Sequence, residues 1–321
     1  MSRQSSYRDD MVARFWRYQK IVFRGCMELF ERPEMPDRRP PVFNKHADFS
    51  NVLMAPDISK EDHKRLLDEI PVQERHRWFR SMTSSQAIAL SVFGNLKIYG
   101  LLGLLNKLHD EGGRPIFDKE TITSENLRME HKVDSLGEPR PTSLDALITG
   151  KHAIAIECKL MEDEVGTCSR PRLTKRDSNY EQDFCDGTYT VQMGRTSRCS
   201  LTEIGVEYWD YVPRVFNWKS DANLDPCPLW TNYQLVRNLL AVSVPSDTMP
   251  YGAGRVVLMY DERNPAFQEG GKGYAAYVET RSALREPDRL RKCSWQRIAK
   301  VVRGEQRLSW LADQVEEKYG I

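Results

Sequence analysis

The stretch AIAIECKL, residues 153–160, decides the fold. Side chains alternate between the two faces of a β-strand, and here the alternation separates two chemistries. One face is apolar and carries Ile154, Ile156, Cys158 and Leu160, while the other carries Ala153, Ala155, Glu157 and Lys159. We therefore expect a strand with one face in the core and an acid and a base side by side on the other, where small alanines leave room for a ligand.

The segment before it, residues 143–149, predicts a second strand that places Asp145 on the face of Glu157. If residues 150–152 form a three-residue hairpin loop, the antiparallel register puts Asp145 directly opposite Glu157. Side chains opposite one another in this way have β-carbons about 5 Å apart. The two carboxylates would then lie within reach of one cation.

This arrangement suits metal-assisted hydrolysis. A hard cation such as Mg²⁺ prefers a few anionic oxygens and keeps positions open for water and phosphate oxygens. Asp145 and Glu157 supply such oxygens, and Lys159 could orient or help deprotonate the attacking water and balance charge on the phosphate. An isolated Glu-x-Lys on a strand is more often a solvated face, so the inference depends on the added acid of the neighbouring strand and on the apolar opposite face.

The surrounding pattern predicts an α/β fold. Residues 85–108 predict a long core helix, with Ser84 or Ser85 able to cap it. Further strands are expected at 127–133 and 255–260, and helices at 232–242 and at 295–319 with a break near Gly304. Residues 1–80 are interpreted as a mostly helical N-terminal extension, and residues 165–228 as an inserted, Cys-containing subdomain within a domain spanning 81–321.

Two short motifs in these strands resemble the PD-(D/E)xK nuclease superfamily: PTSLD at 141–145 and ECK at 157–159. The proline lies four residues before Asp145 instead of adjacent to it. The wider pattern is similar to that of a bacterial restriction-endonuclease-like family over roughly residues 80–321, through SSQ (84–86), LGEPRPTSLDALI (136–148), ECKLME (157–162), CPLWTNYQLVRN (227–238) and LMYDERNP (258–265).

The resemblance implies a restriction-endonuclease-like core in the order αβββαβ, with a mixed central sheet flanked by helices. It also implies a metal held by Asp145 and Glu157 and a catalytic Lys159. Gln234 and Arg237 resemble a helix that some members use to position the lysine or a phosphate; a helix cap and a surface arginine are the alternative. Glu130 is a candidate third metal ligand, or else a partner for Lys132 or an arginine.

The seven cysteines are more ambiguous. Cys168, Cys185, Cys199 and Cys227 fall in the expected insertion and are candidate ligands of a structural Zn²⁺. None forms a CxxC pair, so scattered buried thiols are the competing interpretation. An odd cysteine number argues against a disulfide framework.

The composition of the whole chain does not identify a binding partner, but two local clusters of charge are informative. The chain has 321 residues, 40% hydrophobic and 29% charged, with a net charge of +1, so a nucleic-acid site must come from clustered charge. Residues 281–307 contain nine Lys or Arg against three Asp or Glu, a difference of +6, and RPRLTKR at 170–176 is a second basic run. Both runs are candidate borders of a nucleic-acid groove, or else solvated faces.

A cytoplasmic location is expected, because the charged first 30 residues lack the features of a secretory signal. The most hydrophobic stretch, residues 86–105, contains Asn95, Lys97 and three glycines, which favours a buried helix over a membrane span.

The sequence thus predicts a Mg²⁺-dependent phosphodiesterase, for which Mn²⁺ is a substitute metal. The most favoured form is a DNA endonuclease of restriction or defence type acting on double-stranded DNA, with no membrane partner. The alternatives are a nucleic-acid-binding or regulatory module that keeps the fold with little cleavage, and an RNase or exonuclease with the same site. The oligomeric state stays open, and a homodimer is compatible with the sequence.

Overall fold

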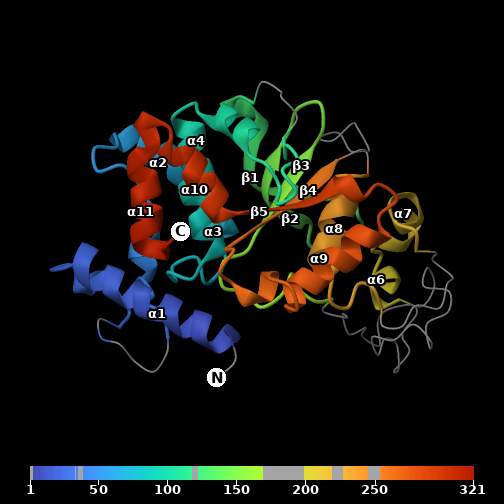
Figure 1. The fold of residues 1–321 in the computed structure, drawn as a ribbon, viewed down its shortest axis with the longest axis horizontal. Coiled ribbons are helices and arrows are strands. Elements are labelled where there is room, and N and C mark those ends of the chain that lie inside the picture. Colours follow the sequence, from blue (N-terminus) through green and yellow to red (C-terminus); the bar gives the residue numbers. More distant parts are fainter. Residues whose placement is uncertain are drawn as a thin grey trace.

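A mixed five-stranded β-sheet in the order β1-β2-β3-β4-β5 lies at the centre of the computed structural model (Figure 1). The structure describes residues 3–32, 34, 39–117, 122–168, 199–218, 227–244 and 254–321. The strands are β1 (Leu127–Val133), β2 (Thr142–Ile148), β3 (Ile154–Cys158), β4 (Arg255–Tyr260) and β5 (Leu290–Ser294). The first three are antiparallel neighbours, whereas β3, β4 and β5 run parallel.

The hairpin formed by β2 and β3 has the predicted register. Ala146 pairs with Ile156 and Leu147 pairs with Ala155, so the next position outward brings Asp145 opposite Glu157. The two faces of β3 are also as predicted, since Ile156 and Cys158 join one core and Ala155 joins the other. Local alternation and a short loop were therefore sufficient to specify this part of the sheet.

Strand β5 was not predicted, because its sequence LRKCS is basic and does not have the pattern of a core strand. All five of its residues are nevertheless buried. The charges are balanced by neighbouring groups: Arg291 lies 3.8 Å from Asp110, and Lys292 lies 2.9 Å from Glu111. Pairing with acids far away in the sequence makes burial of these bases tolerable.

Helices cover both faces of the sheet, with α3, α4, α10 and α11 on one side and α8 and α9 on the other (Figure 1). The α-helices are α1 (Arg3–Val22), α2 (Lys60–Asp68), α3 (Ser85–Ala89), α4 (Asn95–Ile98), α6 (Ser200–Glu203), α7 (Tyr208–Val215), α8 (Tyr233–Ala241), α9 (Lys272–Ala283), α10 (Trp295–Arg303) and α11 (Ser309–Tyr319). Short 3₁₀ segments are Met27–Leu29, Lys45–Asn51, Val72–Glu74, Leu102–Lys107, Ser124–Asn126, Pro265–Phe267, Pro287–Arg289 and Gln306–Leu308. The break expected near Gly304 separates α10 from α11.

The long helix expected at 85–108 is shorter and less regular than predicted. Ser84 caps it as expected, but a π-turn at Leu90–Gly94 joins α3 to α4, and the chain leaves the helix near Gly100 with φ of +66°. The Asn95 amide donates to the Ser91 carbonyl at 2.6 Å, and such side-chain bonds compete with the main-chain ladder. The helix is buried, and no helix in the described ranges is both long and apolar enough to cross a bilayer.

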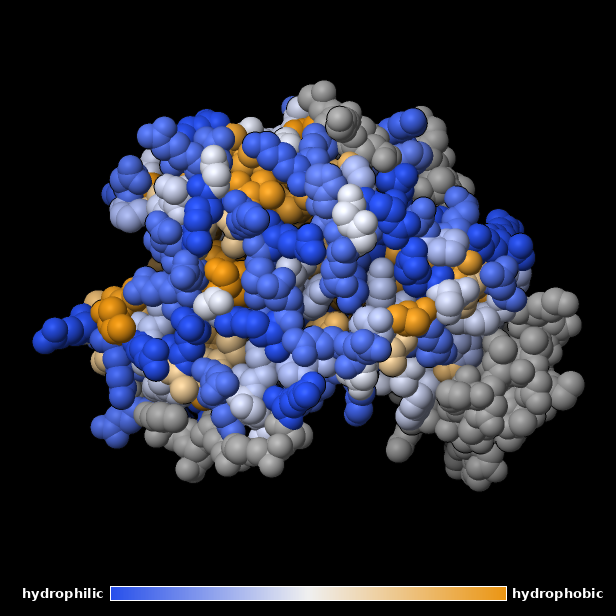
Figure 2. Space-filling view, viewed as in Figure 1, coloured by the Kyte–Doolittle hydropathy of each residue, from blue (hydrophilic) through white to orange (hydrophobic). Residues whose placement is uncertain are grey.

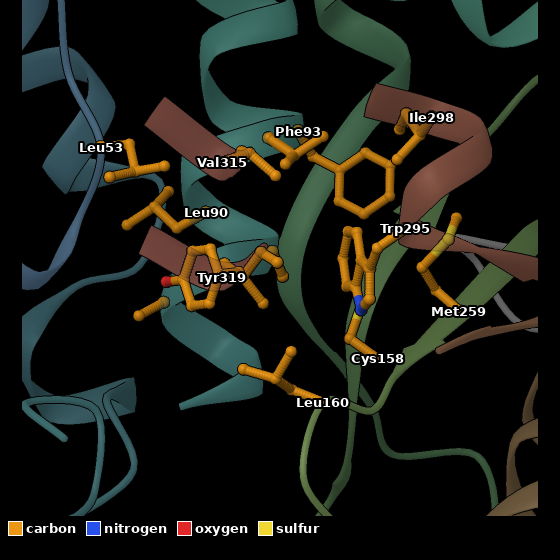
Figure 3. Packing of buried hydrophobic residues seen from close by; sticks show 14 of the residues in the cluster. Leu53, Leu90, Phe93, Cys158, Leu160, Met259, Trp295, Ile298, Val315 and Tyr319 are labelled. Carbon is orange, nitrogen blue, oxygen red and sulfur yellow. The ribbon is translucent and has the colours of Figure 1, made fainter. Parts of the chain in front are cut away.

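Two hydrophobic cores lie on opposite faces of the sheet. The first contains the apolar face of β3 together with residues of α3, α10 and α11; Figure 3 shows Cys158, Leu160, Met259 and Trp295 in it. Phe15 and Trp16 of α1 join the same core, and the Tyr319 ring meets Phe15 edge to face. The second core contains residues of α7, α8 and α9.

The surface in Figure 2 is mostly hydrophilic, with small separate hydrophobic groups.

Most of the expected insertion, residues 169–198 and 219–226, lies outside the described residues, and so does the basic run at 170–176. In the described part, Tyr208 and Trp209 of α7 are buried in the same core as α8. The division of the chain into an extension, a nuclease domain and an insertion stays a prediction.

Lys318 of α11 generates a prediction on stability. Burial lowers the pKa of its ammonium from 10.5 to about 7, and the ammonium donates to the Asn51 carbonyl at 2.5 Å. The unfolded chain therefore binds more protons than the folded chain above pH 7, so stability should rise with pH. From pH 7 to pH 9 we expect the free energy of unfolding to rise by roughly 2 kcal/mol. Lys318→Met should remove most of this rise in urea denaturation.

The exposed Lys107→Met is the matched control and should keep the pH dependence of the parent protein. An equal rise in the parent and in Lys318→Met would show that other groups cause it.

Candidate active site

Glu157 and Lys159 form an ion pair on the face of β3 that is turned towards α8. The Lys159 ammonium lies 2.8 Å from Glu157 Oε1, and the two residues are only 2% and 6% exposed. Burying an isolated charge is costly, so a pair in this position requires further polar partners.

Helix α8 supplies those partners from one face. Gln234 and Asn238 are four residues apart and therefore lie on the same side of the helix. Asn238 donates from Nδ2 to Glu157 Oε2 at 2.6 Å, and Lys159 donates to Gln234 Oε1 at 2.7 Å. Both ends of the ion pair are thus fixed by amides of one helix.

Arg237 extends the same face of α8. Its guanidinium lies 5.5 Å from the Tyr233 ring centroid, and Nε has no hydrogen-bond partner among the described residues. Burial alone would lower the pKa of Arg237, but the nearby Glu157 carboxylate raises it. The alternative of a helix cap is wrong for Gln234, which contacts Lys159, and Arg237 is partly buried near Glu157.

Asp145 on β2 lies opposite Glu157 and is the second carboxylate of the candidate site. Its Oδ2 accepts the main-chain N–H of Cys158 at 2.6 Å, whereas Oδ1 accepts no hydrogen bond from a described residue. Burial raises the pKa of Asp145 well above its ordinary value, and the carboxylates of Glu157 and Glu130 raise it further. One carboxylate oxygen is therefore held by the sheet while the other stays available.

Glu130 lies opposite Asp145, at the one position of β1 where the ladder with β2 is interrupted. Its φ of 46° is rare for a residue with a side chain and places local strain beside the site. Glu130 accepts from Gln86 Nε2 and from Ser143 Oγ, each at 2.6 Å. The expected alternative of a Lys132 partner is wrong, since Lys132 pairs with Glu74.

Lys159 is held as an ammonium. Burial alone would lower its pKa, but Glu157, Glu162 and Asp145 together raise the pKa above its ordinary value. The main chain here is fixed as well, because Trp295 Nε1 donates to the Lys159 carbonyl at 2.9 Å. At neutral pH this side chain is a positioned cation and not a free base.

The loop after Lys159 is tied to distant parts of the chain. Asn264 donates to the carbonyls of Leu160 and Glu162, both at 3.0 Å. The hydroxyl of Tyr7 in α1 donates to the Leu160 carbonyl at 2.9 Å. The N-terminal helix therefore contacts the segment that immediately follows the candidate site.

The candidate residues share one cleft of about 1190 Å³. All six predicted site residues outside the cysteines line it: Glu130, Asp145, Glu157, Lys159, Gln234 and Arg237. So do Arg8, Arg32, Arg39 and Arg140, which are exposed and form no ion pair with any residue that the structure describes. An acidic floor thus lies among exposed arginines.

The basic segment 281–307 does not border this cleft, contrary to expectation. None of its bases is among the lining residues. Several are engaged elsewhere: Lys292 pairs with Glu111, and Arg303 with Glu316. These paired charges contribute to the local fold around β5 and α10 and do not line the cleft.

The zinc interpretation lacks support from the described cysteines. Cys199 and Cys227 are buried, Cys168 is partly buried, and Cys185 lies outside the described residues. Among the described residues no group of three or more His, Cys, Asp or Glu side chains could hold a metal ion. Glu130, Asp145 and Glu157 likewise do not converge as three ligands of one metal ion.

Sequence reasoning missed Asn238, Gln86 and the arginines of the cleft. Gln86 and Asn238 lie within quoted motifs, but nothing local shows that they reach carboxylates 44 and 81 residues away. The arginines are dispersed from Arg8 to Arg140, and only the fold gathers them.

A family model described as "Restriction Endonuclease associating with ARP" matches residues 31–320, which leaves α1 outside the match. No curated protein and no solved structure is significantly similar to the chain.

The contact between Asn238 and Glu157 predicts a specific cost. Asn238→Leu removes the donor to a buried carboxylate, so the free energy of unfolding in EDTA should fall by about 1–3 kcal/mol. Asn232→Leu, directly before the same helix, is the control, because Asn232 is equally buried and its side chain contacts only the neighbouring Thr231 hydroxyl, while its amide nitrogen has no hydrogen-bond partner among the described residues. Urea denaturation compares the two, and an equal loss would mean that the Glu157 contact contributes nothing.

Proposed function

Because the chain belongs to the family of restriction endonucleases described as associating with ARP, we propose that it is a metal-dependent nuclease that cleaves DNA. The observation that carries the proposal is the group Asp145, Glu157 and Lys159 on the floor of a cleft lined by arginines. Hydrolysis of a phosphodiester by a positioned water requires little more than correct placement and charge stabilisation.

The donors fit a hard divalent cation. Asp145 and Glu157 supply oxygen ligands from opposite positions of neighbouring strands, and Asp145 Oδ1 accepts no protein hydrogen bond from a described residue. The raised pKa of Asp145 reflects burial and repulsion by other carboxylates, which a cation would relieve. When bound, Mg²⁺ or Mn²⁺ would polarise a phosphoryl oxygen and acidify a water. Mg²⁺ is the first cation to test at this site.

Lys159 acts in this scheme as a cation. Its ammonium is oriented by Gln234 and Glu157, so it can stabilise the negative charge that develops on the phosphate as water attacks. Its raised pKa argues against a role in removing the proton from that water. Gln86 and Asn238 act through other residues, because they hold the carboxylates of Glu130 and Glu157 in place.

The arginines around the cleft support a polyanionic substrate. Arg8, Arg32, Arg39 and Arg140 have no acidic partner among the described residues, so their charges are available for phosphates. Such contacts bind DNA without reading its sequence. We infer that they hold the backbone of duplex DNA while Asp145, Glu157 and Lys159 carry out the cleavage.

Binding and cleavage should therefore separate in variants. Lys159→Ala and Asp145→Asn should each lower the rate of plasmid cleavage in MgCl₂ by at least about a hundredfold, because both groups act on the transition state. DNA affinity measured in EDTA should change little, because most of it comes from phosphate contacts. Asp145→Asn should also raise the Mg²⁺ concentration needed for residual activity, since one anionic ligand is lost.

The exposed Lys107→Ala and Asp134→Asn are matched controls and should cleave at the parent rate. Near-parent cleavage by a folded Lys159→Ala or Asp145→Asn variant would place the nuclease centre elsewhere. Binding without any cleavage by the parent protein, in Mg²⁺ or Mn²⁺, would favour a DNA-binding module.

The arginines can be tested by their salt dependence. Arg8→Ala and Arg140→Ala should each weaken duplex binding and reduce the slope of log affinity against log salt by about 1, as expected when one phosphate contact is lost. Arg303→Ala and Arg307→Ala remove equally basic side chains from the run outside the cleft and should leave the slope unchanged. Fluorescence anisotropy at several salt concentrations gives both quantities, and equal effects from the two pairs would contradict this assignment.

A further inference from the structure

An exposed tryptophan, Trp78, lines the same cleft as the candidate carboxylates. The residue is 48% exposed, although a large aromatic side chain gains free energy from burial. The Arg77 guanidinium lies 5.2 Å from its ring centroid, and Arg77 has no ion pair in the described part of the chain. The pair thus combines a flat apolar surface with an available cation.

The turn that carries Trp78 is held by several hydrogen bonds. The neighbouring Phe79 is only 1% exposed, and Asn51 donates to its carbonyl at 2.6 Å. The Trp78 carbonyl accepts from Ser81 N at 2.8 Å, and the main-chain N–H of Trp78 donates to His76 Nδ1 at 3.3 Å. The exposed ring therefore lies on a turn whose backbone is hydrogen-bonded on both sides of Trp78.

The same turn is connected to the floor of the cleft. His76 N donates to Gln86 Oε1 at 2.9 Å, and Gln86 Nε2 donates to Glu130 at 2.6 Å. Glu130 lies opposite Asp145 between β1 and β2. A short chain of hydrogen bonds thus joins the Trp78 turn to Glu130, the residue opposite Asp145.

We propose that Trp78 determines specificity by stacking on an unpaired nucleobase close to the scissile phosphate. This inference rests on the proposed nuclease function and refines its substrate class. In a continuous duplex the base faces are covered by neighbouring base pairs, so only an unpaired base offers a face to an aromatic ring. Arg77 then reaches a phosphate beside the stacked base, and the arginines of the cleft hold the flanking backbone. The preferred substrate is DNA with an unpaired base at the cleavage position.

The test compares three fluorescein-labelled DNA probes of one sequence: a fully paired duplex, the duplex with a one-base bulge, and the single strand. Binding by the full chain is measured in EDTA, where no metal supports cleavage. Trp78→Ala should weaken binding to the bulged and single-stranded probes by roughly tenfold, equivalent to about 1.4 kcal/mol, and leave the paired duplex within twofold. Comparison of the two sensitive probes identifies which source of unpaired base is preferred.

Two controls make the readout specific to stacking. Trp78→Tyr keeps an aromatic ring and should retain most of the affinity, and Phe49→Ala removes an exposed ring outside the cleft and should have no effect. With 2-aminopurine at the bulge, binding by the parent protein should quench its fluorescence, and Trp78→Ala should abolish the quenching.

Equal losses on all three probes, no loss on any, or no binding by the parent protein would each overturn the proposal. Discrimination between probes without cleavage in Mg²⁺ would retain the role of Trp78 and reject the nuclease. Cleavage by a parent protein whose Trp78→Ala variant binds every probe normally would reject the role of Trp78 alone.

Discussion

The buried ion pair between Glu157 and Lys159 is the constraint on which the rest of the site depends. Both side chains are almost fully buried between β3 and α8, where unpaired charges would be strongly destabilising. The chain meets this requirement with amides from α8, which satisfy Glu157 Oε2 and contact the ammonium of Lys159. The strand order also supports this pair, because β3 lies at the centre of the sheet and its backbone pairs with a strand on each side.

Features set by residues close together in the sequence could be predicted, whereas contacts between residues far apart in the sequence could not. The two faces of β3 and the register that aligns Asp145 with Glu157 follow from alternation and a short loop, so both were predictable. The hydrogen bond from Asn238 to Glu157 was not predictable, because α8 is mainly apolar and the two residues lie 81 positions apart in the sequence. The burial of β5 could not be predicted for a related reason: a basic residue such as Lys292 indicates an exposed position, and its partner Glu111 lies far away in the sequence.

The N-terminal segment shows how a region without recognisable chemistry contributes to a site. Its sequence contains no catalytic motif and was interpreted as an extension, and α1 precedes the region that the family model matches. Yet Tyr7 binds the carbonyl of Leu160 directly after the candidate lysine, and Arg8 lines the cleft. The N-terminal segment thus lines the cleft and contacts the candidate site without contributing to the group of Asp145, Glu157 and Lys159.

The charges within the cleft explain why a metal and the arginines would have different tasks. Glu130, Asp145, Glu157 and Glu162 place four carboxylates around the candidate site, against which Lys159 and Arg237 supply two positive charges. A phosphodiester is itself anionic, so these carboxylates oppose its approach, and a divalent cation would offset their excess charge. The arginines are exposed and need no such help. Attraction of the strand would therefore be independent of metal, whereas bringing its phosphate against Asp145 and Glu157 would require it.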